Sequence, residues 1–187
     1  MPVLSTRRLV LLPLSRDMIR RRLETDTFTL NAVTPQGPLT IQFSPEWPGV
    51  RLGLFPHLLR QMKAQGLAAD PGDFCVVLRE TGDVVGQIGA KAPPDAAGAQ
   101  EIGYGFNPSC WGKGYATEAV GALVAHLLTQ PHVRSVTAQT ALTNRPSERV
   151  LEKLGFTRIG SSRDARHGEL TVWQQTSEPS PSPSEWP

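Results

Sequence analysis

The stretch Trp111-Gly-Lys-Gly-Tyr-Ala-Thr-Glu118 decides the fold, because it joins a glycine turn directly to an amphipathic helix. The apolar residues behind it keep the helical spacing over 115–128: Val120, Leu123, Val124, Leu127 and Leu128. Such a turn exposes backbone N–H groups at the positive end of a helix dipole, where a pyrophosphate can bind. The spacing excludes a Walker P-loop and the dinucleotide fingerprint. A helix that simply begins after a glycine turn is the plainer alternative.

The strand predicted before this turn, Glu101-Ile-Gly-Tyr-Gly-Phe106, carries glycines in its interior. Alternation divides it into two faces, one with Ile102, Tyr104 and Phe106 and the other with Glu101, Gly103 and Gly105. Glycines weaken a strand, and close approach of a ligand to the backbone is a common reason for them. Asn107-Pro108 then ends the strand, so its backbone can bond an extended ligand. Together, strand and turn favour phosphate binding.

The rest of the chain alternates between strand and helix patterns. Strands are predicted over 9–12, 74–78, 84–88, 133–142, 156–161 and 169–174, and helices over 16–23, 52–65 and 146–154. Ser15 is the expected N-cap of the first helix, and Leu54, Leu58, Leu59 and Met62 are expected to share the buried face of the second, with Pro56 in its first turn. Gly155 is expected to end the helix over 146–154. A hairpin turn is predicted at Thr81-Gly-Asp83, within the connection 79–83, and the last two strands are expected to pair through a turn at His167-Gly168. Residues 25–49 show no clear period, and no element is predicted there. The pattern indicates an α/β domain with a mixed sheet and helices on its faces.

Composition narrows the function classes. The chain has 187 residues, 39% of them hydrophobic, which suffices for one packed domain. No apolar run is long enough for a membrane span, and the net charge of +2 argues against nucleic-acid binding. Cys75 and Cys110 stand without a CxxC pattern or a histidine cluster, so neither disulfides nor a metal site is expected. We expect one domain over 1–175, a disordered Pro/Ser-rich tail over 176–187, and a cytoplasmic location without a membrane partner.

Two motifs of the chain resemble the GNAT N-acetyltransferase superfamily in their order and separation. The first spans 101–118, and the second is Asn144-Arg-Pro-Ser-Glu-Arg-Val-Leu-Glu-Lys-Leu-Gly-Phe156. The likeness is closest to the branch with the bacterial ribosomal-protein N-terminal acetyltransferases, whose first strand resembles the opening Thr6-Arg-Arg-Leu-Val-Leu11. The resemblance covers 4–23 and 74–173, and leaves 25–70 unmatched. It implies a mostly antiparallel central sheet with helices on both faces, and acetyl-CoA as the co-substrate.

The resemblance also assigns the cofactor-binding residues. The family's pyrophosphate loop corresponds to Trp111, Gly112, Lys113, Gly114, Tyr115 and Ala116, with Thr117 beginning the helix. Pantetheine is expected along the strand near Phe106 and Asn107, and Asn144 matches an amide that contacts the cofactor arm. Trp111 stands where many relatives have Gln or Arg, which costs a polar contact but leaves the backbone N–H groups intact. Judged without the motif, Asn144 is simply a helix cap.

The usual proton-transfer residues of the family are missing from this chain. The position of the base holds Gln139 and that of the acid holds Leu151, and neither side chain can transfer a proton. The remaining candidates are Glu101 as base, directly or through a water, and Ser147 as donor to the thiol. Glu101 can equally be a solvated carboxylate and Ser147 a surface hydroxyl. Proton loss straight to water is a further route.

The sequence therefore predicts an acetyl-CoA-dependent N-acetyltransferase that acts on a primary amine by direct attack in a ternary complex. The acceptor is a protein N-terminus or a small amine, and 25–70 either line its site or merely cover the sheet. Two alternatives stay open: a catalytically inactive module that binds acetyl-CoA as a sensor or scaffold, and a nucleotide-binding protein that uses the same turn. Many relatives dimerise, so a homodimer is compatible with the chain, although nothing in it fixes an interface.

Overall fold

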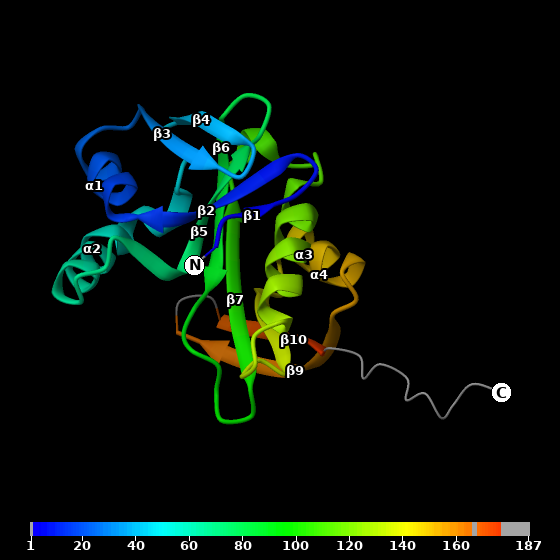
Figure 1. Ribbon diagram of the computed structural model, residues 1–187. Coiled ribbons are helices and arrows are strands. Elements are labelled where there is room, and N and C mark those ends of the chain that lie inside the picture. The colour runs from blue at the N-terminus through cyan, green and yellow to red at the C-terminus, as the bar shows by residue number, and fades with distance from the viewer. Residues whose placement is uncertain (1, 166–167, 177–187) are drawn as a thin grey trace. The chain divides into compact units, whose positions relative to one another are not determined.

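The computed structural model describes residues 2–165 and 168–176. The chain divides into two compact units. Unit 1 comprises Met1–Ala92 and Ile102–Leu123, and unit 2 comprises Pro93–Glu101 and Val124–Pro187. Figure 1 follows the strands and helices along the chain. The α/β class with a mostly antiparallel sheet is confirmed, because every strand ladder with a defined register in either unit is antiparallel.

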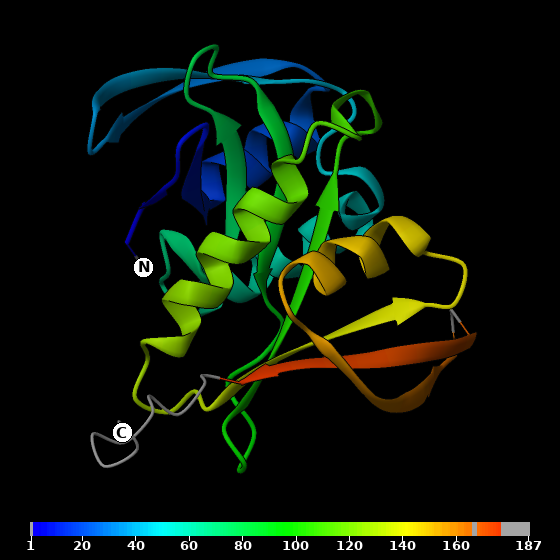
Figure 2. The same cartoon turned by 90° about the vertical axis from the view of Figure 1, so that its right-hand side faces the viewer.

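The sheet of unit 1 has the order β1-β2-β5-β6-β7. Its strands are β1 (Leu4–Ser5), β2 (Leu9–Ser15), β5 (Ala69–Leu78), β6 (Val84–Ala90) and the 102–106 part of β7 (Ala99–Phe106). The β5–β6 hairpin predicted around Thr81-Gly-Asp83 is confirmed, with Val77 opposite Val84. Helix α3 (Tyr115–Leu128) begins in this unit with the bounds that the periodicity predicted. Figure 2 shows its first turns on one face of the unit 1 strands, with α1 and α2 on the other face.

Helix α1 (Arg16–Glu24) begins where the sequence predicted, because the hydroxyl of Ser15 accepts a hydrogen bond from the N–H of Met18 at 3.2 Å. Helix α2 spans Phe55–Ala64, and a 3-10 turn, η1 (Gly49–Leu54), precedes it. The prediction for this helix was wrong at its start. Leu54, placed on the buried face by sequence, is 54% exposed, whereas Phe55 is fully buried. Proline lies in the first turn of α2, as expected.

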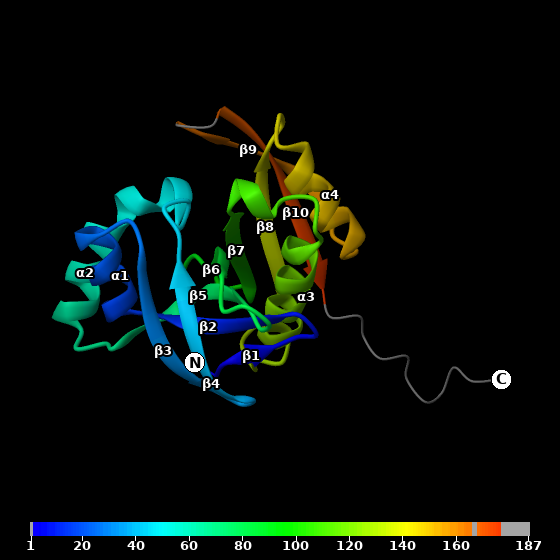
Figure 3. The same ribbon diagram turned by 90° about the horizontal axis from the view of Figure 1, so that it is seen from above.

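Residues 28–43 form an antiparallel hairpin that the sequence did not predict. Its strands are β3 (Phe28–Thr34) and β4 (Gly37–Phe43), and they make a separate two-stranded sheet (Figure 3). A chain of aromatic contacts joins this hairpin to α2. Phe28 stacks on Phe43, and Trp47 meets both Phe43 and Phe55 edge-on. The hairpin is therefore fixed by its packing against the core.

Unit 2 carries the strand order β8-β10-β9. Its elements are β8 (Ser135–Ala141), α4 (Arg145–Lys153), β9 (Thr157–Asp164) and β10 (Gly168–Thr176). Pairing of the last two strands is confirmed, and the turn residue His167 lies outside the described residues. The tail predicted over 176–187 was wrong at its first residue, because Thr176 is the last residue of β10, and 177–187 lie outside the described residues. Helix α4 is followed by Gly155 at φ +80°, the C-terminal position where the sequence predicted a glycine. None of the helices described has the length and apolarity to cross a membrane.

Candidate cofactor site

The predicted phosphate loop lies at the N-terminus of α3, within unit 1. Gly112 and Gly114 have φ values of +75° and +78°, a region that favours glycine, so both glycines are required by the backbone. The helix begins at Tyr115, and the N–H of Glu118 donates to the carbonyl of Gly114 at 3.1 Å. Within the described part of the chain, the N–H groups of 112–114 donate to no backbone carbonyl. Three adjacent N–H donors at the positive end of a long helix can bind an anionic ligand.

Trp111 has a structural use that its position in the motif did not suggest. The residue is 65% exposed, and its indole Nε1 donates to the carbonyl oxygen of Phe106 at 2.8 Å. This bond ties the start of the loop to the end of β7, across the short 3-10 turn η2 (Pro108–Cys110). The tryptophan therefore shapes the loop from outside it, while the backbone donors are left intact.

Asn107 holds β7 against β6 with its side chain. The amide Nδ2 donates to the carbonyl of Val84, and the backbone N–H donates to that of Val85, both at 2.9 Å. The residue is 5% exposed. Its amide group is therefore committed to the sheet, and the contact with pantetheine expected for Asn107 stays a prediction. Phe106 beside it is half-buried.

The glycines of β7 and β6 differ in what surrounds them. A Cβ at Gly105 would meet nothing within 4 Å, whereas one at Gly103 would lie 3.1 Å from Cε of Lys91. A Cβ at Gly86 would clash with the carbonyl of Gly105 and the ring of Phe106. Gly86 is thus required by packing, and the backbone at Gly105 is open to a ligand.

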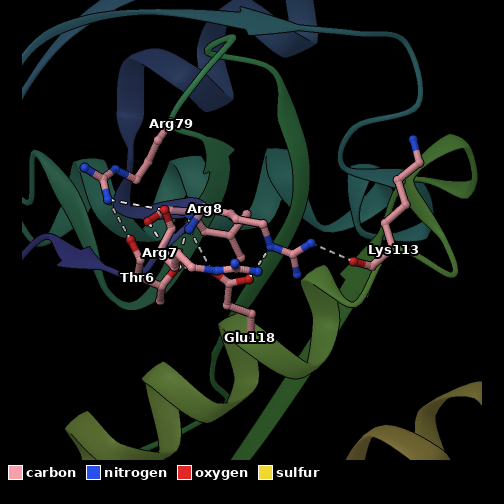
Figure 4. Close-up of polar contacts among 7 residues, drawn as sticks. Thr6, Arg7, Arg8, Arg79, Lys113 and Glu118 are labelled. Atoms are coloured by element: carbon pink, nitrogen blue, oxygen red, sulfur yellow. Dashed lines mark hydrogen bonds and ion pairs between the residues drawn. The ribbon is translucent and has the colours of Figure 1, made fainter.

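An ion-pair cluster beneath the loop was missed by the sequence analysis (Figure 4). Arg8, directly before β2, donates from Nε to Oε2 of Glu118 on α3 at 2.6 Å, and its backbone N–H donates to Oε1 at 2.8 Å. The hydroxyl of Thr6 donates to the same Oε1 at 2.6 Å. Nη1 of Arg8 reaches the carbonyl of Lys113 at 2.9 Å, and the guanidinium lies 4.7 Å from the centre of the Tyr115 ring. The loop is therefore tied to the segment between β1 and β2.

The electrostatics of this cluster favour an ionised glutamate. Burial alone raises the pKa of Glu118, but the hydrogen bonds from Thr6 and Arg8 outweigh it, so this pKa lies below its ordinary value. A second carboxylate of unit 1 shows the opposite balance. Burial raises the pKa of Asp73 despite its ion pair with Arg51 at 3.1 Å. The donors around Glu118 therefore outweigh its burial, and those around Asp73 do not.

Three of the predicted site residues lie in unit 2: Glu101, Asn144 and Ser147. Oδ1 of Asn144 accepts from the N–H of Ser147 at 3.3 Å, so Asn144 is the N-cap of α4, as the plainer interpretation of this residue held. A cofactor contact would therefore fall to its amide nitrogen. Glu101 and Ser147 are both half-buried.

The residues at the family's usual proton-transfer positions are unsuited to that task in the structure as well. Leu151 is fully buried in α4, and Oε1 of Gln139 accepts from the hydroxyl of Ser162 at 2.7 Å. Among 2–165 and 168–176, no three His, Cys, Asp or Glu side chains gather as a metal site would require.

Comparison with known proteins agrees with this geometry. The sequence matches the acetyltransferase (GNAT) domain family over residues 19–157, and the chain belongs to that family. The match includes 25–70, so the expectation that this segment is unmatched was wrong. It is 30% identical over 107 residues to an uncharacterized N-acetyltransferase, p20, of Bacillus licheniformis, a match that covers 57% of this chain and 60% of that protein. The chain spans about half to three fifths of the length of the curated relatives it matches.

Solved structures share the fold at low sequence identity. A putative GNAT-family acetyltransferase from Bordetella pertussis superposes with a TM-score of 0.67 at 20% identity, covering 94% of this chain and 100% of that one. RimL, a ribosomal L7/L12 alpha-N-protein acetyltransferase solved in complex with coenzyme A, gives a TM-score of 0.63 at 13% identity, covering 93% and 97%. The predicted GNAT fold is thus confirmed.

Proposed function

We propose that the protein is an acetyl-CoA-dependent N-acetyltransferase that transfers the acetyl group to a primary amine. The observation that carries this proposal is the loop of a GNAT-family chain with unused backbone N–H groups at 112–114, held at the start of α3. A diphosphate needs several donors and a favourable dipole in one place, and this loop supplies both without a metal ion. Acetyl-CoA, when bound, supplies the activated thioester.

The chain's own residues fit this co-substrate in three respects. The loop from Trp111 to Thr117 offers backbone donors to the phosphates, with Gly112 and Gly114 giving the required backbone shape. The open backbone at Gly105 leaves room for the pantetheine arm beside Phe106 and Asn107. We assign to Asn144 a contact with the same arm, through the amide nitrogen that its capping bond leaves over.

Two proton transfers accompany the reaction, and we assign them to Glu101 and Ser147. The acceptor ammonium must lose a proton before its nitrogen attacks the thioester carbon, and the departing thiolate must gain one. Glu101 takes the first proton directly or through a water, and the hydroxyl of Ser147 donates the second. With Leu151 fully buried and Gln139 uncharged, no other residue at the family's usual positions competes for these roles.

The test is an acetyl-transfer assay on the full chain with a panel of amines. The panel holds peptides with different N-termini, polyamines, amino acids and aminoglycosides, and the products are detected as free CoA thiol and as an acceptor heavier by one acetyl group. Turnover with any member supports the proposal. Tight binding of CoA without turnover across the whole panel would contradict it.

A second candidate follows from the same residues. Loss of both usual proton-transfer side chains, at 139 and 151, favours a module that binds acetyl-CoA as a sensor or scaffold without turning it over. The binding experiment is the same for both candidates, and only the amine panel separates them. RimL acts on a ribosomal protein, so the panel includes the N-terminal peptides of ribosomal proteins as the first acceptors to try.

A further inference from the structure

The orientation of one peptide unit in the phosphate loop is controlled by a residue between β1 and β2, more than 100 residues earlier in the chain. The carbonyl and the N–H of a trans peptide point in opposite directions from the same plane. The Lys113 carbonyl points to Nη1 of Arg8 at 2.9 Å, so the Gly114 N–H of the same peptide points away from Arg8 (Figure 4). A loop with glycine on both sides of Lys113 can rotate this plane easily, because glycine restricts its dihedral angles least. Arg8 removes that freedom.

The guanidinium is itself held in place on several sides. Nε is bound by Glu118, the ring of Tyr115 lies beneath it, and Nη2 lies 3.3 Å from the point that a Cβ at Gly114 would occupy. The side chains of the pair are 35% and 17% exposed. Because the ion pair with Glu118 balances the charge, Arg8 contributes chiefly geometry to the loop, and little net positive charge.

We propose that Arg8 is a positioning residue for the co-substrate's phosphates, which fixes the Lys113–Gly114 peptide with its N–H directed to the diphosphate, and that Glu118 holds Arg8 in that role. The proposal rests on the proposed function, since it assigns the residues that prepare the loop for CoA. It also extends the site to the opening Thr6-Arg7-Arg8 segment, for which the sequence indicated only a likeness to the first strand of related acetyltransferases.

A charge-removing variant distinguishes this role from simple electrostatics. Glu118→Gln takes a negative charge away from the phosphate site, so electrostatics alone predicts tighter CoA binding. If Glu118 holds Arg8, the same variant must weaken binding. Arg8→Met is expected to raise the Kd for CoA about tenfold, the equivalent of about 1.4 kcal/mol. Arg8→Lys, which keeps the charge but loses the planar fork, should fall between Arg8→Met and the wild type.

The experiment measures CoA binding by calorimetry for wild type, Arg8→Met, Arg8→Lys, Glu118→Gln and the double variant Arg8→Met/Glu118→Gln. The control is Arg7→Met, which removes the same charge from the neighbouring exposed residue, and we expect its Kd to stay within about twofold at physiological salt. The double variant should bind no more weakly than Arg8→Met alone, since both changes break one arrangement. Turnover at saturating acetyl-CoA should be unchanged while the KM for acetyl-CoA rises.

The possible results distinguish failure of the positioning role of Arg8 from failure of the proposed acetyltransferase function. Wild type that binds no CoA would refute the proposed function itself. Wild type that binds, together with a Glu118→Gln variant that binds as well or better, would overturn the positioning role alone. If Arg8→Met does not fold, Arg8→Lys and Glu118→Gln decide the question, with thermal unfolding as the check that each variant is native.

Discussion

Two regions of unit 1 reach a defined structure in different ways: the loop at 111–114 with the start of α3, and the segment 28–64 that holds the hairpin and α2. Backbone geometry determines the structure of the loop, because Gly112 and Gly114 adopt positive φ and α3 begins directly after them. Burial of side chains determines the structure of the segment, because Trp47 packs against both Phe43 and Phe55. The loop is accordingly sensitive to changes in backbone shape, and the segment to the loss of side-chain volume.

The largest effect on stability is expected in the segment. Trp47 is fully buried between Phe43 and Phe55, so Trp47→Ala removes a large apolar volume and should cost about 3–5 kcal/mol in the free energy of unfolding. Urea denaturation measures this loss. The matched control is Leu54→Ala, which should cost under about 0.5 kcal/mol because Leu54 is 54% exposed. Equal losses for the two variants would show that burial does not fix this segment.

The next largest effect is on the loop. Gly114→Glu should weaken CoA binding by about 100-fold or more, because a carboxylate would compete with the diphosphate for one space and the residue is at φ +78°. Calorimetric titration with CoA measures the loss. Unchanged affinity in a folded variant would mean that the loop does not bind the phosphates.

Gly37→Glu is the matched control for that substitution. Gly37 also has a positive φ, +116°, and a Cβ there would meet nothing within 4 Å, but it lies at the start of β4, directly after the β3–β4 turn. The same change of residue should therefore lower stability through backbone strain and leave the Kd for CoA as it is. If Gly37→Glu lowered the affinity for CoA as much as Gly114→Glu does, the distinction between the two regions would be wrong.

A smaller effect concerns acid stability. Because the pKa of Glu118 lies below its ordinary value, its ionised form stabilises the fold above about pH 4.3, and this stabilisation is lost as the pH falls through the pKa of the folded state. Glu118→Gln should thus cost about 2 kcal/mol at pH 7 and much less near pH 3. Urea denaturation at both pH values measures the difference. A gap between variant and wild type that stays constant with pH would show that the charge of Glu118 contributes nothing.

The smallest effect is expected outside both regions. Glu101→Gln should lower kcat about tenfold at neutral pH and leave the Kd for CoA unchanged. The loss in kcat is limited because water can accept the proton of the acceptor amine in place of Glu101. Steady-state kinetics over a range of pH, with the best acceptor from the amine panel, measures this. Equal turnover in wild type and variant would make Glu101 a structural residue.

Sequence analysis predicted the elements whose signal is local. The helix over 115–128, the cap at Ser15 and the hairpin around 79–83 each depend on residues close together in the chain, and all three are confirmed. The hairpin over 28–43 was missed because its strands are stabilised by contacts with residues such as Trp47, which no local period reveals. Arg8 was missed for the same reason, since its partners Lys113 and Glu118 are more than 100 residues away along the chain.

The measurement that tests the central claim most directly is thermal unfolding of the wild-type chain with and without acetyl-CoA, with ATP and NAD as controls. At a concentration about 100-fold above the Kd, a specific ligand adds about 2.7 kcal/mol, which corresponds to a rise in Tm of about 5–10 °C for a chain of this size. We predict that rise with acetyl-CoA and none with NAD or ATP. No shift with acetyl-CoA, or an equal shift with ATP, would contradict the assignment of the loop at 111–114 to coenzyme A.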